Sequence, residues 1–252
     1  SYKNKREYII SSDDSFHGKL IATGTITGSL KHYDFPKMEN TKFFKYNDFE
    51  SLVNTVKSVD KNNKCNVYAI ILEPFIAQRI FGYDKDFIKN TRNLCNEYNI
   101  RLIFDEVYTG WGKTGNIFSF QRYNDYYPDI LTFSKSFGGG KSSISGFVTK
   151  DDVFKKAFGN KKTALMHTST YNGFGEECAT AIEAINILLE DKLVDRGKDI
   201  HLLISKSLKE LKIKYPNIIN EIRGMGAING ISFISPLDIF SKIADMIPLE
   251  FV

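Results

Sequence analysis

The sequence predicts an α/β protein whose mostly parallel sheet is flanked by helices. Short apolar runs alternate with stretches in which apolar residues recur at helical spacing, and this alternation is typical of parallel strands joined by crossover helices. The chain has 252 residues, of which 42% are apolar and 25% are charged. Such a composition is that of an ordinary globular protein with one sizeable core and room for part of a second domain.

Three neighbouring segments define the elements of the first half. Residues 67–72 form a continuous apolar run, which predicts a buried strand that ends at Glu73-Pro74. A helix follows, and residues 101–107 are the next predicted strand. The residues on the buried face of that helix are Phe87, Thr91, Leu94, Cys95 and Tyr98.

The middle of the chain alternates turns with short strands. Residues 110–115 are rich in glycine and predict a loop, and the aromatic stretch from there to Pro128 is too short and broken for a long helix. Apolar residues at 130–133 and at 145–149 predict two further strands.

Two helices and a strand are predicted in the last third. The first helix begins near Glu176, where acidic residues suit the helix dipole; the second ends before Pro216. A strand at residues 228–234 follows a turn at residues 223–226. The expected inner faces of the two helices are Cys178, Ile182, Ile185 and Leu189, and then Leu202, Leu203, Leu208 and Leu211.

This pattern divides the chain into two domains. We expect residues 1–222 to be a large domain that lacks its N-terminal part, and residues 223–252 to be the truncated beginning of a smaller C-terminal α/β domain. The chain starts at Ser1 without methionine and ends in an apolar tail, so we interpret it as a piece of a longer protein.

Charge and cysteine usage exclude several classes of partner. The net charge of +4 is spread over lysine- and asparagine-rich stretches, unlike the dense basic face of a nucleic-acid-binding protein. No run approaches the roughly 20 apolar residues of a membrane span, and the N-terminal residues do not resemble a signal peptide. Cys65, Cys95 and Cys178 form no CxxC pair, so we expect no disulfide framework, no metal site and a cytoplasmic location.

Two glycine motifs resemble nucleotide-binding loops without meeting their requirements. Gly110, Gly112 and Gly115 have the dinucleotide-binding spacing, but the carboxylates just before them would repel a pyrophosphate and no long amphipathic helix follows. The two GK[ST] sequences at residues 112–114 and 140–142 lack the first glycine of a Walker loop.

An amine and a carboxylate are expected at one edge of the sheet. Lys135 follows the predicted strand 130–133, and Asp105 lies in the strand 101–107. An amine that forms an imine, beside a carboxylate that keeps a ring nitrogen protonated, is the minimum equipment for chemistry with pyridoxal 5'-phosphate (PLP). A structural role is commoner for either residue taken alone.

Several motifs in register carry a resemblance to a known family. They are Ser15-Phe16-His17-Gly18, Glu73-Pro74, the run Asp105–Gly115, Pro128-Asp129-Ile130, the run Ser134–Gly140 and the run His167–Tyr171. In order and spacing they are similar to the class III aminotransferases over nearly the whole chain. This resemblance implies the fold type I architecture of PLP enzymes and transfer of an amino group from an amine or amino acid to an oxo acid or aldehyde.

The same resemblance implies roles for particular residues. Lys135 forms the Schiff base with PLP and moves the proton during transfer, and Asp105 pairs with the pyridine nitrogen. Phe16 and Val107 contact the two faces of the cofactor ring.

Three further cofactor-binding residues are implied in the same way. His17 lines the pocket. Thr170 reaches the cofactor phosphate of a neighbouring subunit, which implies a homodimer with a shared active site. Tyr108 stands where the family usually has a glutamine that bonds the phenolic oxygen of the cofactor.

The resemblance leaves two alternatives open. Gln78 replaces a family glutamate that gates between two substrates, and a neutral side chain cannot form that ion pair. A PLP enzyme of the same fold with another reaction (aminomutase, decarboxylase or racemase) is one alternative. A catalytically incomplete relative of the fold is the other, because the glycine- and serine-rich turn that binds the phosphate in the family is not in this sequence.

Overall fold

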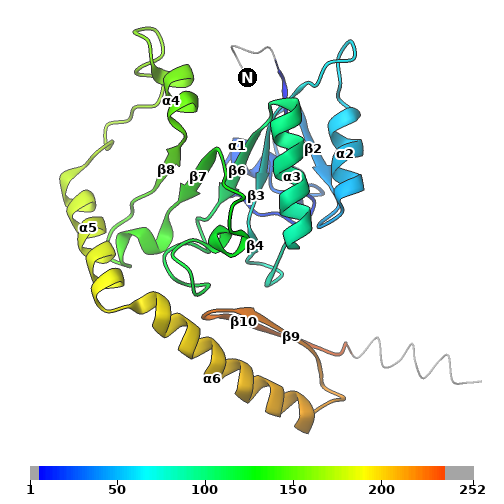
Figure 1. Ribbon diagram of the computed structural model, residues 1–252, viewed down its shortest axis with the longest axis vertical. Coiled ribbons are helices and arrows are strands. Elements are labelled where there is room, and N and C mark those ends of the chain that lie inside the picture. Colours follow the sequence, from blue (N-terminus) through cyan, green and yellow to red (C-terminus); the bar gives the residue numbers. More distant parts are fainter. Residues whose placement is uncertain (1–5, 236–252) are drawn as a thin grey trace, which may run out of the picture.

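A six-stranded sheet forms the centre of the computed structural model, which describes residues 6–235 (Figure 1). The strand order is β2-β1-β3-β6-β7-β8; all neighbours are parallel except β7 and β8, which are antiparallel. The predicted mostly parallel sheet is therefore confirmed. The sheet strands are β1 (Tyr8–Ser12), β2 (Thr41–Phe44), β3 (Val67–Leu72), β6 (Arg101–Asp105), β7 (Ile130–Phe133) and β8 (Gly146–Thr149).

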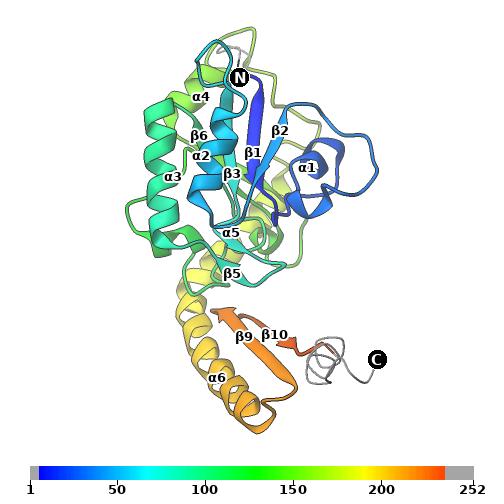
Figure 2. The ribbon, with the colours of Figure 1, turned by 90° about the vertical axis from the view of Figure 1, so that its right-hand side faces the viewer.

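Helices flank this sheet and then extend away from it. In Figures 1 and 2, α2 and α3 lie beside the sheet, whereas α5 leads to α6, which projects from the sheet with a small hairpin beside it. The helices are α1 (Ile21–Thr25), α2 (Phe49–Lys57), α3 (Lys85–Tyr98), α4 (Asp151–Phe158), α5 (Gly175–Glu190) and α6 (Leu193–Lys214). Short 3-10 turns occur at Gly28–Leu30, Ser119–Tyr123 and Lys135–Gly138.

Two hairpins complete the described part of the chain. One joins β4 (Phe75–Ile76) to β5 (Phe81–Gly82), and the other joins β9 (Ile219–Met225) to β10 (Ile228–Phe233). Strand β9 packs along α6. Residue 223, at which we expected the smaller domain to begin, lies within β9.

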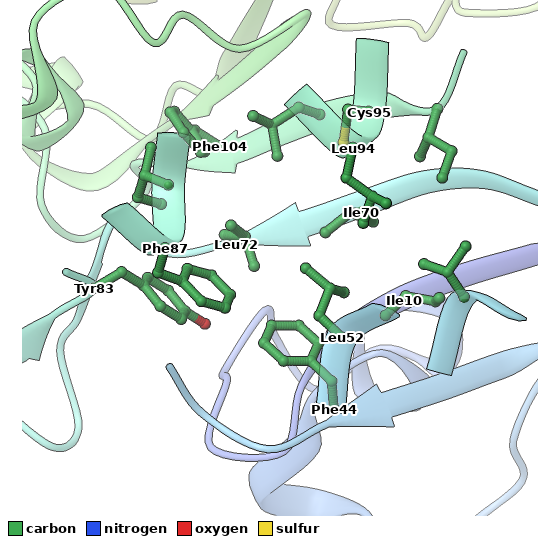
Figure 3. Close-up of a cluster of buried hydrophobic side chains, with 14 of the residues drawn as sticks. Ile10, Phe44, Leu52, Ile70, Leu72, Tyr83, Phe87, Leu94, Cys95 and Phe104 are labelled. Atoms are coloured by element: carbon green, nitrogen blue, oxygen red, sulfur yellow. The ribbon is translucent and has the colours of Figure 1, made fainter. Parts of the chain in front are cut away.

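The core lies between the sheet and helices α2 and α3. Figure 3 shows side chains of β3 and β6 packed against both helices. Local signals start and stop these helices: Asp48 accepts a hydrogen bond from Ser51 N at 2.8 Å at the start of α2, and Asn99 ends α3 in the left-handed region, with φ +51°. The labelled core residues are Ile10, Phe44, Leu52, Ile70, Leu72, Tyr83, Phe87, Leu94, Cys95 and Phe104.

The predicted elements of the first half are confirmed, with one shortened. The strand 67–72 and the helix face that carries Phe87 occur as predicted. The strand predicted to reach residue 107 ends at Asp105. Its carboxylate accepts a hydrogen bond from Val107 N at 3.0 Å, which turns the chain out of the sheet.

The predicted inner faces of the last two helices are largely wrong. In α5 Ala181 and Leu188 are the buried residues, whereas Ile182 and Leu189 are exposed. Cys178 and Ile185 are half-buried. Helix α5 contacts the turn at Lys135–Gly138 and helix α6. Only a narrow strip of its surface is therefore covered.

Helix α6 departs further from its predicted inner face. Leu202, Leu203 and Leu211 are exposed, and Leu208 is half-buried. Gly197 is the buried residue of α6, and it lies close to Gly112 O. The helix contacts the glycine-rich loop and α5, and it also packs against the hairpin strands β9 and β10.

The turn predicted at residues 223–226 is wrong except for its last residue. Residues 223–225 belong to β9, in which Arg223 pairs with Gly230 and Gly224 with Asn229. The chain reverses at Gly226, which has φ +59°. Gly224 therefore occupies a paired position in β9, whereas Gly226 is the residue at which the chain reverses.

Candidate active site

A cavity of about 400 Å³ opens at the carboxyl ends of four sheet strands. Open α/β sheets bind ligands at this edge, because the loops that follow parallel strands converge there. Six of the seven predicted site residues line the cavity, and Thr170 does not. The lining residues are Phe16, His17, Gly18, Glu73, Ala77, Gln78, Asp105, Val107, Tyr108 and Lys135.

Asp105 is held by neighbours on both oxygens at the end of β6. Oδ1 accepts hydrogen bonds from Val107 N at 3.0 Å and from Thr132 Oγ1 at 3.3 Å. Oδ2 lies 2.8 Å from His17 Nδ1. Since each carboxylate oxygen accepts two hydrogen bonds, Oδ2 retains room for one further donor.

His17 is buried beside this carboxylate. Its side chain is 1% exposed, and Nε2 has no hydrogen-bond partner among the described residues. A buried polar atom without a partner costs free energy unless a ligand or water satisfies it. The His17 backbone is fixed separately, because His17 N donates to Thr27 Oγ1 at 2.9 Å.

Glu73 fixes the loop that carries Phe16. The carboxylate follows β3 directly, is 5% exposed and accepts a hydrogen bond from Phe16 N at 2.7 Å. Burial raises the pKa of Glu73 to about 7, while His17 and the Phe16 N–H act in the opposite direction. From the sequence, Glu73 was identified as the end of a strand and as part of a family motif, without a role in the site; its position at a carboxyl end of the sheet was the available signal.

Lys135 enters the cavity from the turn after β7. Its backbone has φ +50°, a left-handed conformation that costs a non-glycine residue free energy and is found mainly where function requires it. Trp111 braces this turn by stacking on Phe137, with ring centroids 4.9 Å apart. Lys135 is an exposed residue, and its amine lies over the ring of Tyr108, 4.9 Å from the centroid.

A second lysine lies close to this amine. Lys113 Nζ is 5.4 Å from the centroid of the same Tyr108 ring and donates to Tyr108 O at 2.6 Å. Burial, followed by the charge of Lys135, lowers the pKa of Lys113 to about 8. From the sequence, Lys113 was identified only as part of an incomplete Walker motif and of the run Asp105–Gly115, without a role of its own.

Glu106, next to the site, has a structural role. It is fully buried, accepts hydrogen bonds from Thr109 Oγ1 and from Phe120 N, the latter at 2.7 Å, and so closes the loop after β6. The dinucleotide-binding interpretation fails in the structure as expected, because only a short 3-10 turn at Ser119–Tyr123 follows the glycines.

The residues that line the cavity fit PLP, the cofactor that the sequence implies. The cavity offers an amine at Lys135, a carboxylate at Asp105 with accepting capacity, and apolar walls at Phe16 and Val107. The unpaired Nε2 of His17 supplies one further polar atom. A planar heteroaromatic aldehyde can use each of these features.

Thr170 lies outside the lining of this cavity. Thr170 is exposed in the turn segment before α5. Within residues 6–235, Cys65, Cys95 and Cys178 are free thiols, and no group of three or more potential metal ligands occurs. Across the same residues, no helix has the length and apolar character needed to cross a membrane.

The sequences similar to this chain are those of aminotransferases. The model of the family described as aminotransferase class-III matches residues 1–246. An acetylornithine aminotransferase of Prochlorococcus marinus is 33% identical over 233 residues, which cover 91% of this chain and 54% of the relative. One of Methanocaldococcus jannaschii is 35% identical over 230 residues, covering 88% and 53%.

Solved structures agree with these relatives. A transaminase from the marine bacterium Virgibacillus matches with a TM-score of 0.82 and 25% identity, covering 92% of this chain and 54% of that one. An ornithine aminotransferase from Toxoplasma gondii, described with partial occupancy of PLP at its active site, matches with a TM-score of 0.77 and 28% identity, covering 96% and 55%. The chain therefore spans about half the length of the proteins it matches.

Proposed function

The chain belongs to the class III aminotransferases, and from this premise we propose that it is the catalytic lysine-bearing part of a PLP-dependent aminotransferase. The enzyme transfers an amino group from an amine or amino acid to an oxo acid or aldehyde. The names of the relatives favour a donor of the ornithine type.

One observation carries this proposal. Lys135 and Asp105 come from neighbouring parallel strands, β7 and β6, and line the same cavity of about 400 Å³. The pairing of an amine with a carboxylate that still has accepting capacity is what PLP chemistry requires.

When bound, PLP supplies an aldehyde carbon and a ring that accepts electrons from the substrate. Lys135 Nζ would hold the aldehyde group of PLP and would serve as the general base for proton transfer. Asp105 would accept a hydrogen bond from the protonated ring nitrogen at Oδ2, so that the ring could take up negative charge. His17 holds Asp105 in place through its Nδ1 contact.

The remaining lining residues position the cofactor. Phe16 and Val107 supply the apolar contacts to the ring, and Glu73 fixes the Phe16 backbone. Tyr108 stands beside the amine of Lys135. The neutral Gln78 on the cavity wall leaves a carboxylate-bearing substrate without a repelling charge at that position.

We extend the proposal to assembly, domains and location. The enzyme is a homodimer in which Thr170 reaches the cofactor phosphate of the other subunit; the exposure of Thr170 and of its neighbour Tyr171 supports this. Residues 1–222 belong to the large domain, and residues 223–252 begin the smaller one. The three free thiols support a reducing cytoplasm.

The test is borohydride reduction of the PLP-loaded full-length protein, followed by peptide mass mapping. We expect one reduced adduct, on Lys135, and its loss in Lys135→Ala. Lys141→Ala, which removes an exposed amine of the same loop, is the matched control and should retain the adduct. An adduct that persists in Lys135→Ala would contradict the assignment.

The choice between reaction types needs a separate measurement. An aminotransferase requires an oxo acid or aldehyde acceptor for repeated turnover, whereas a mutase, decarboxylase or racemase of the same fold does not. Turnover that continues after every carbonyl acceptor has been removed would favour the alternative.

A further inference from the structure

The ring of Tyr108 is shared by two amines. Lys135 Nζ lies 4.9 Å and Lys113 Nζ lies 5.4 Å from its centroid. Both distances fall within the roughly 6 Å over which an aromatic face attracts a cation. Lysine side chains carry about 2 kcal/mol of rotamer entropy, so an exposed lysine amine keeps one position only if something attracts it there.

Tyr108 itself is fixed by its loop. Its carbonyl oxygen accepts a hydrogen bond from Lys113 Nζ at 2.6 Å. The turn around it is closed by Gly110 N, which donates to Glu106 O at 3.0 Å, and by the contact of Val107 N with Asp105. The ring is therefore attached to a constrained backbone, whereas Lys135 projects from a turn with an exposed side chain.

Together these contacts assign Tyr108 a function in the site. We infer that Tyr108 is a positioning residue whose ring face holds the Lys135 amine at the cavity, and that Lys113 keeps this ring in place through the Tyr108 backbone. The inference rests on the proposed function only for its effect on turnover. The contact itself is a property of this chain.

The lowered pKa of Lys113 supports the close approach of the two amines. Its second cause, after burial, is the charge of Lys135. The two ammonium groups repel each other, and an aromatic ring that attracts both acts against this repulsion. The Tyr108 ring is the group that both amines contact.

The test compares Tyr108→Phe, which keeps the ring, with Tyr108→Leu, which removes it. The chain without cofactor receives a brief pulse of acetic anhydride, and the acetylation of each lysine is read by peptide mass spectrometry. Loss of the ring contact should make Lys135 acetylate about 2–5-fold faster in Tyr108→Leu, as expected for a cation–π contact of ~0.5–1 kcal/mol. Tyr108→Phe should match the wild type.

Internal references keep the result specific. Lys89, an exposed residue of α3, should acetylate at one rate in all three proteins, which controls for the dose of reagent. In the PLP-loaded full-length enzyme, kcat should be about 2–5-fold lower in Tyr108→Leu than in Tyr108→Phe by the same argument. KM should change less than kcat in both variants.

Two outcomes would overturn the inference. One is an unchanged Lys135 acetylation rate in Tyr108→Leu; the other is a Tyr108→Phe variant that behaves like Tyr108→Leu, which would assign the effect to the hydroxyl. The proposed function fails independently, if borohydride traps no adduct on Lys135 of the wild-type enzyme, because the acetylation assay needs no cofactor.

Discussion

The sheet core and the last two helices differ in what covers their apolar side chains. The main cluster of buried apolar residues runs from Ile10 to Leu131, and its central members are inaccessible to solvent. Helices α5 and α6 instead expose large apolar residues, such as Leu203 at 68% and Ile213 at 80%. The first region is stabilised by its own core, whereas exposed apolar surface on this scale is typical of a face that another protein surface covers. The homodimer proposed above offers such a surface.

The largest expected effect lies within the sheet region, at Asp129, which directly precedes β7. This residue is 3% exposed and pairs with Arg92 of α3 at 3.0 Å and with Lys150, beyond β8, at 2.8 Å. Burial alone would raise the pKa of Asp129, but the hydrogen bonds from Lys150 and Leu102 N and the charge of Arg92 outweigh it and lower the pKa. Asp129→Asn leaves the Arg92 charge buried and uncompensated, so we expect a loss of about 3–5 kcal/mol.

Chemical denaturation of the chain measures this loss. Asp125→Asn changes the same chemical group at an exposed position four residues away and should alter the free energy of unfolding by less than about 0.5 kcal/mol. Equal effects of the two variants would show that the buried Asp129 network does not stabilise the sheet region.

A pair of leucine truncations sharpens the comparison directly. Leu72 of β3 is 0% exposed and Leu203 of α6 is 68% exposed. Leu72→Ala should destabilise the chain by about 2–5 kcal/mol, because it removes buried contacts and leaves a cavity. Leu203→Ala should change the stability of the isolated chain by less than about 0.5 kcal/mol.

Urea titration of both variants gives the two free energies. A large loss in Leu203→Ala would mean that α6 is covered in solution by a second copy of the chain. Repeating the titration at several protein concentrations separates that explanation from packing within the chain.

The last expected effect concerns the pH dependence of stability and Glu106, in the loop that joins β6 to β7. Burial raises the pKa of Glu106 to about 7 from an ordinary value of 4.5. The folded state therefore holds this proton more tightly than the unfolded state, so its contribution is complete below pH 4.5 and is lost as pH rises towards 7. Relative to wild type, Glu106→Gln should gain on the order of 3 kcal/mol between these pH values.

Unfolding curves at a series of pH values test this difference. Glu73, whose pKa burial also raises to about 7, keeps its own pH dependence in the variant and serves as an internal reference. Parallel pH profiles for wild type and Glu106→Gln would show that Glu106 is not the group responsible.

Sequence reasoning succeeded where an element is covered on its expected faces. The run at residues 67–72 and the helix that contains Phe87 are both packed within the chain, so their patterns predict their structure directly. Strands β1 and β2 and helix α2 were missed, although β1 is paired with a strand on each side. The helical faces of α5 and α6 were mispredicted, because a pattern of leucines does not reveal which protein surface covers it.

The candidate site was predicted from strand ends and motifs, and its partners were not. Lys135 and Asp105 could be placed at one edge because both follow or end parallel strands. The contact between His17 and Asp105 joins residues 88 positions apart, and no local pattern encodes such a distance. The Lys113 amine reaches the same site through a loop whose course depends on Gly112, with φ +88°.

At Lys135 the residue type that best suits the backbone differs from the residue type that the proposed activity needs. Glycine adopts its left-handed conformation, at φ +50°, without the steric penalty that every other residue meets. A polypeptide optimised for folding alone would therefore place glycine there and lose its reactive amine. Attempts to make this protein more heat-resistant by repairing unfavourable backbone positions should leave residue 135 untouched.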